Sequence, residues 1–175
     1  MAYYITGIVS IVITMIVQMS IAPLMQIASV IPNFLVIPLV FFSLGLRPKY
    51  KLGERHFENV FRGIFLGFFT GLVEGINSRL FWADVFSWVL IGFLLGLIAG
   101  PINRESPLVK SLLLFSSAFL QGIFFFIPLY ISFSVSFSLF FGRLLFCSLY
   151  TTLLGVFILR LTEEKREEGI INYGD

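Results

Sequence analysis

The stretch Gly63–Gly75, GIFLGFFTGLVEG, carries a glycine at every fourth position of an almost wholly apolar run, and Gly92–Gly100, GFLLGLIAG, repeats this spacing. In water an interior glycine costs a helix about 1 kcal/mol relative to alanine, whereas in a bilayer small residues let helices approach closely. The pattern therefore predicts membrane helices, and its glycines either pack two helices together or form a docking groove for a partner or ligand. We name them the first glycine ridge (Gly63, Gly67, Gly71 and Gly75) and the second glycine ridge (Gly92, Gly96 and Gly100).

The overall composition agrees with a membrane protein. Of 175 residues, 58% are hydrophobic and only 13% are charged, against about 25% charged in a typical soluble domain. The length fits one domain. A net charge of +2, with no basic run interleaved with aromatics, argues against a nucleic-acid partner. Cys147 is the single cysteine, so an intrachain disulfide is excluded.

Apolar runs divide the chain into about six segments that we expect to be transmembrane helices, which predicts an all-α integral membrane bundle. The expected helices are Tyr4–Ala22, Pro32–Leu46, Val60–Gly75, Val85–Ala99, Leu108–Tyr130 and Phe137–Leu161. They form one membrane domain, 1–161, followed by a short polar cytoplasmic tail, 162–175, that we expect to fray. The first run lacks a basic leader, so we interpret it as a retained helix. Because Ser132–Ser138 alternates polar and apolar residues, we expect an extended segment there on the outer side.

The basic residues predict the orientation of these helices. Six helices place ten Lys and Arg residues on the side of both termini, and Arg79 alone on the other. Cytoplasmic loops are enriched in Lys and Arg, so both termini and the 47–58 loop are expected to be cytoplasmic. The ten residues are Arg47, Lys49, Lys51, Arg55, Arg62, Arg104, Lys110, Arg160, Lys165 and Arg166.

Two ionisable residues interrupt the predicted helices. Glu74 is either a functional intramembrane acid or a carboxylate near the outer headgroups, where Arg79 would be its partner. Arg143 either extends its side chain to the membrane surface or pairs with Glu74 or Asp84 between helices. Gln18 and Gln121 are polar residues that we expect to hydrogen-bond across the bundle.

The sequence offers no residues for catalysis. It contains no Ser-His-Asp set, P-loop or dinucleotide fingerprint, and we expect no catalytic residues, cofactor or metal. His56 stands alone in a charged loop, whereas a closed zinc site needs about four ligands. An ion or proton conductor would need a series of ionisable groups through the bundle, and Glu74 and Arg143 are too few.

The order of features across residues 10–100 resembles the rod shape-determining MreD family of bacteria. Gln18 lies in the first helix, and the Pro32-Asn33 pair opens an apolar second helix. After a short basic loop comes a Gly-Phe-x-x-Gly element, Gly67–Gly71, and an acid. The family usually has an aspartate after this element, where this chain has Glu74, one residue earlier.

The resemblance implies a non-enzymatic scaffold of the cell-elongation machinery that builds the lateral wall and maintains rod shape. It implies a bacterial inner-membrane location and direct binding to MreC, a single-span coiled-coil protein. It also implies indirect association with the actin-like MreB and wall-synthesis enzymes. Besides the bilayer itself, the candidate partner-interface or structural residues are Pro32, Asn33, Gly63, Gly67, Gly71, Glu74, Gly75, Gly92, Gly96 and Arg143.

The family's fold is similar to that of the substrate-binding S subunits of energy-coupling-factor transporters, which supplies an alternative function. A vitamin-binding S subunit needs polar and aromatic side chains that converge on a small ligand. The residues of this chain that we expect to meet that need are Glu74, Asn77, Arg79, Trp82 and Asp84.

Overall fold

The computed structural model is built from six helices in the residues that it describes, which are 2–27, 30–44, 55–76, 78, 80–99, 106–133 and 136–171. No strand occurs in these ranges. The helices are α1 (Ala2–Ser20), α2 (Val36–Leu44), α3 (Arg55–Gly75), α4 (Phe81–Ile98), α5 (Pro107–Phe133) and α6 (Phe137–Ile171). The loop 45–54, Arg79 and Arg104 lie outside the described residues, so five of the eleven basic residues that predict the orientation are not placed.

Three helices of the described chain are long and apolar enough to cross a membrane, through Phe81–Ile98, Pro107–Phe124 and Phe137–Leu161. Tyr4–Ser20 is also apolar but shorter. The first turns of α3 carry charge, including an ion pair between Arg62 and Glu58. The chain is therefore an all-α protein with the composition of a membrane protein.

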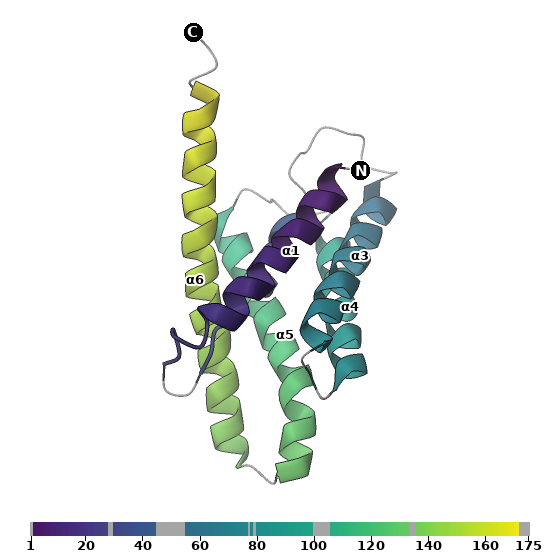
Figure 1. Cartoon of the computed structure of the whole chain (residues 1–175), viewed down its shortest axis with the longest axis vertical. Coiled ribbons are helices and arrows are strands. Elements are labelled where there is room, and N and C mark those ends of the chain that lie inside the picture. The colour runs from purple at the N-terminus through teal and green to yellow at the C-terminus, as the bar shows by residue number, and fades with distance from the viewer. Residues whose placement is uncertain are drawn as a thin grey trace.

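The helices pack as antiparallel neighbours. Gly63 of α3 lies against Gly92 of α4, while Gly75 lies against Phe81. α5 and α6 are also antiparallel. The ring centroids of Phe119 and Phe141 lie 6.4 Å apart, and Leu114, earlier in α5, lies against Gly155, later in α6. In Figure 1 the first turn of α1 and the last turns of α6 lie at the upper end, while α3 and α5 both end toward the lower end.

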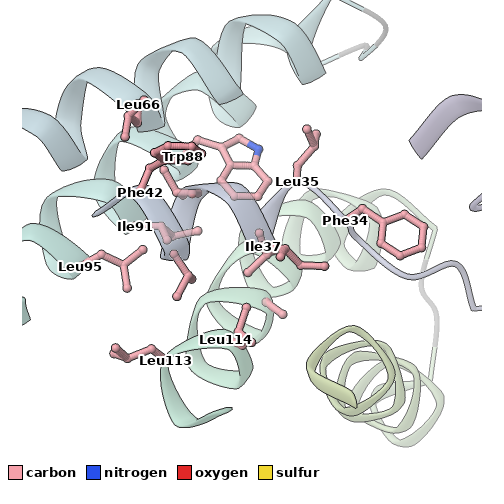
Figure 2. Packing of buried hydrophobic residues seen from close by; sticks show 14 of the residues in the cluster. Phe34, Leu35, Ile37, Phe42, Leu66, Trp88, Ile91, Leu95, Leu113 and Leu114 are labelled. Carbon is pink, nitrogen blue, oxygen red and sulfur yellow. The ribbon is translucent and has the colours of Figure 1, made fainter. Parts of the chain in front are cut away.

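The core is organised around α2, which is buried on every side. Leu35, Val36 and Leu39 have no exposed surface, and Trp88 and Leu114 cover them from α4 and α5. Figure 2 shows Trp88 in the middle of this cluster, with its indole nitrogen turned toward the side where Leu35 lies. A helix that is apolar all round belongs in the interior of a bundle, which explains why the shortest helix occupies the centre.

The second helix begins later than predicted. It starts at Val36 rather than Pro32, and the preceding Val30–Asn33 is irregular or extended. Pro38 therefore lies in the first turn, where a backbone N–H has no partner within the helix, so Pro38 does not interrupt α2. As the third residue of α2, Pro38 is compatible with a helix that starts at Val36.

The end of the chain is also more helical than predicted. Ser132 and Phe133 close α5, and Phe137 and Ser138 open α6, so the expected extended segment is wrong at four of its seven positions, while 134–135 lie outside the described residues. A helix satisfies its own backbone groups, which lipid cannot do. α6 also continues past residue 161, the expected end of the membrane domain, as far as Ile171. The tail is rich in Glu, Lys and Arg, which are strong helix formers.

Candidate functional site

The two glycine ridges face each other. A Cβ atom added at Gly71 would lie 2.6 Å from the Cα of Val85, and one added at Gly96 would lie 2.6 Å from the Cα of Val60. At Gly63 the added atom would meet the carbonyl of Gly92. The two ridges therefore pack α3 onto α4 with their backbones in contact. Because α3 and α4 cover each other's glycines, a partner helix cannot lie along them. Gly100 is outside the described residues.

This close packing brings Glu74 of α3 against Trp88 of α4. The indole Nε1–H of Trp88, a residue with no exposed surface, donates a hydrogen bond to the Glu74 carboxylate. The side chain of Asn33, from the segment before α2, lies close enough to the same carboxylate to interact with it. Glu74, a partly exposed residue in the last turn of α3, thus contacts two other parts of the fold.

The segment before α2 is held by side chains of α1 and α6. The Gln18 amide donates to the Pro32 carbonyl (2.9 Å) and accepts from the Phe34 N–H (2.7 Å). The Thr151 hydroxyl accepts from the Asn33 N–H at 3.0 Å. Non-helical backbone at membrane depth is tolerated only where protein satisfies its polar groups. We call this set of residues (Gln18, Asn33, Glu74, Trp88 and Thr151) the polar junction.

Two further contacts anchor the chain just upstream of the polar junction. The hydroxyl of Tyr150 donates to the Met25 carbonyl at 2.9 Å, and the Cys147 thiol approaches the Ile31 carbonyl at 3.4 Å. One face of α6 therefore fixes the whole irregular connection between α1 and α2. Because α6 follows that connection by more than 100 residues, its role is a product of the tertiary fold.

The polar junction was only partly predictable. Gln18, Asn33 and Glu74 stand out as polar residues in apolar runs, and Gln18 does bond across the bundle; Gln121 is buried in α5. Trp88 and Thr151 were not predicted. The available signal for Trp88 is that a buried indole N–H needs a hydrogen-bond partner, and no such signal exists for Thr151.

The pairing of Arg143 with Glu74 or Asp84, one of the two alternatives for this residue, is not seen among the described residues. Arg143 is exposed on α6, and within the described chain the Arg62–Glu58 pair is the one ion pair seen, so Arg143 joins neither Glu74 nor Asp84. This leaves the interpretation in which Arg143 extends toward the membrane surface. Asp84 is 4% exposed, and its Oδ2 has no hydrogen-bond partner among the described residues.

The structure describes three of the five residues expected to line a vitamin pocket. Trp82 is 79% exposed and faces outward, while the Glu74 carboxylate accepts a hydrogen bond from Trp88. Asp84 lies near enough to Glu74 for the two carboxylates to repel each other. Asn77 and Arg79 are outside the described residues.

The outer part of α6 carries an exposed apolar stripe at heptad spacing, with steps of three and four residues. Its members are Leu139, Gly142, Phe146, Leu149 and Leu153, all exposed; Leu153 is 71% exposed. A Cβ atom added at Gly142 would meet nothing within 4 Å among the described residues. Unlike the two ridges, this surface, which we call the α6 stripe, is not covered by the chain itself.

Comparison with known proteins gave no match to a family model, a curated protein or a solved structure. What the chain does is therefore argued from its own residues and their arrangement.

Proposed function

We propose that this chain is an MreD-like scaffold of the bacterial inner membrane that binds a single-span partner helix and performs no chemistry. The observation that carries the proposal is the α6 stripe. This surface is apolar, has heptad spacing and contains a glycine, Gly142. The described residues of the bundle leave it uncovered. Hydrophobic residues that repeat at this spacing face a second helix along its length, and small residues allow close approach.

A six-pass topology supports the proposal. α2 alone, with nine residues, is too short to cross a hydrocarbon core of about 30 Å. A fully extended chain over Val30–Asn33, followed by helical geometry to Leu44, would reach about 30 Å, from about 3.3 Å per extended residue and 1.5 Å per helical residue. Six passes put both termini on one side, as the ends of α1 and α6 lie in Figure 1, and the ten-to-one distribution of basic residues makes that side cytoplasmic.

The partner is expected to resemble MreC, a single-span coiled-coil protein whose transmembrane helix lies on the α6 stripe. α6 has 35 residues and is therefore about 50 Å long, so it extends beyond a hydrocarbon core. The same helix fixes the α1–α2 connection through Tyr150 and Thr151. Binding at α6 would couple the partner to the most extended element of the fold, with MreB-like filaments and wall-synthesis enzymes joined indirectly.

Cross-linking from α6 tests this directly. The full chain is co-expressed with an MreC-like partner, with one cysteine at Leu149 in a Cys147→Ser background, and a matched cysteine at Ile13 on the exposed face of α1. We expect the Leu149 position to cross-link to the partner's transmembrane helix and the Ile13 position not to. Equal cross-linking from both positions, or from neither, would contradict docking on the α6 stripe.

A second variant separates docking from folding. Gly142→Leu adds a side chain where the bundle has open space, so the protein should fold normally and lose partner capture. Retained capture would show that Gly142 is not at the interface. If calorimetry instead finds a vitamin or its precursor bound at nanomolar affinity, about −12 kcal/mol, the S-subunit alternative replaces the scaffold.

A further inference from the structure

The structure contains a partly open cavity of 520 Å³ between α1, α2 and α6. Its lower part is formed by Val17, Phe34 and Leu154, and its upper part by Ser10 and Leu159. It lies on the inner half of α6, beyond the α6 stripe, which ends at Leu153. The cavity is therefore distinct from the proposed partner surface.

The walls are suited to hydrocarbon. They are almost entirely aliphatic and aromatic, and the hydroxyl of Thr14 is already engaged by the Ser10 carbonyl at 2.7 Å. A polar ligand needs a few converging donors and acceptors, which this cavity does not supply among the described residues. An apolar chain would replace the dispersion contacts that the wall atoms otherwise lack.

The length of the cavity suits part of an acyl chain. Along α1 the cavity extends from Ser10 to Val17, which is about 10 Å at 1.5 Å per residue. An extended hydrocarbon chain is much thinner than a helix with side chains, which is about 10–12 Å across, and it fits in this space.

A basic group lies beside the upper part of the cavity. Phe157, Ile158 and Leu159 line the cavity, and Arg160 follows them as an exposed residue one turn above Phe157. Basic residues at the cytoplasmic end of pockets between transmembrane helices favour anionic lipid headgroups. In the topology proposed above, Arg160 lies at that cytoplasmic end.

We propose that this cavity binds one acyl chain of an anionic phospholipid from the inner leaflet, with Arg160 holding the headgroup phosphate. The bound chain completes the packing between α1, α2 and α6. The α6 residues of the cavity begin at Leu154, directly after the end of the α6 stripe.

Native mass spectrometry of the full chain in mild detergent tests the proposal. Phosphatidylglycerol and phosphatidylcholine with identical acyl chains are added in equal amounts. We expect phosphatidylglycerol to be retained about fivefold better, the effect of about one basic residue near an anionic surface. Arg160→Gln should abolish that preference while leaving acyl-chain retention in place. An unchanged preference in Arg160→Gln would overturn the role of Arg160.

Filling the cavity provides the second test. Thr14→Phe places a ring in the cavity and should lower retention of both lipids at least severalfold, whereas the matched control Val12→Phe changes the exposed face of α1. If Thr14→Phe does not fold, Ser10→Phe fills the upper part instead. Equal retention by the filled variant and Val12→Phe would show only annular lipid and overturn the site. A partner helix cross-linked to a cysteine at Thr14 would overturn it as well.

Discussion

Replacing single glycines by alanine should have opposite effects at Gly71 and Gly142, although both lie within helices. At Gly71 the new Cβ would lie 2.6 Å from the Cα of Val85 and 3.2 Å from its carbonyl oxygen. Ordinary contacts with a Cβ are 3.4–4 Å, so α3 and α4 must separate by about 1 Å at this point, an adjustment of the size that overpacking imposes on a core. The neighbouring atoms belong to backbone and cannot rotate away.

The size of the effect follows from two opposing terms. Overpacking costs typically about 1–3 kcal/mol, while alanine improves helix propensity by about 1 kcal/mol. Gly71→Ala should therefore lower the free energy of unfolding by up to about 2 kcal/mol, because packing outweighs propensity. Gly142→Ala meets nothing within 4 Å among the described residues, so only the propensity term applies, and the variant should be as stable as the native chain or slightly more stable.

Denaturant unfolding of the two variants in detergent micelles, followed by tryptophan fluorescence, measures this difference. Trp88 is a suitable probe because it lies in the α3–α4 contact and is fully buried. Equal stability of the two variants, or a more stable Gly71→Ala, would refute the close backbone packing of the two glycine ridges. Loss of partner capture in Gly142→Ala without loss of stability would further support the α6 stripe.

Three other predictions test the polar junction and the orientation. Glu74→Gln keeps an acceptor for the Trp88 indole and should unfold at nearly the same denaturant concentration as the native chain. Glu74→Leu leaves the indole N–H unpaired, so its free energy of unfolding should fall by about 1–3 kcal/mol in the same titration. Equal losses of stability in the two variants would refute the Glu74–Trp88 hydrogen bond. Gln18→Leu should speed amide hydrogen exchange at Phe34, and unchanged exchange would show that Gln18 does not hold this segment. Cysteines at Lys51 and Asp175 should resist an impermeant reagent applied to intact cells, and labelling of either would exclude the six-pass orientation.

The parts of the fold that were predictable follow from local patterns. The glycine spacing in Gly63–Gly75 and Gly92–Gly100 indicated two closely packed helices, and the structure shows that the ridges pack against each other. The apolar runs indicated the helices themselves, because backbone groups in lipid must be satisfied within the segment. What the spacing left undecided was the identity of the second surface. Glycine allows close approach to any helix, so the same pattern fits a partner or a neighbour.

The parts that were not predictable depend on distant residues. The start of α2 at Val36 depends on Gln18 and Thr151, which satisfy the backbone before it. Thr151 lies more than 100 residues away from this segment, and nothing in its local sequence distinguishes it from Thr152. The two alternatives for Arg143 could not be separated for the same reason: sequence separation does not show which face of α6 a residue occupies, and Arg143 lies on the exposed one.

The distribution of polar groups connects the fold to the proposed function. A transporter subunit must leave polar side chains free to meet a ligand, whereas here Glu74, Asn33 and Gln18 are bonded to the protein itself. Breaking those bonds to bind a ligand would leave buried polar groups unpaired, at about 1–3 kcal/mol for each group. The polar residues therefore stabilise an irregular connection at the centre of the bundle. Under the proposed function, a partner helix would be recognised through the apolar α6 stripe, by shape and spacing rather than by charge.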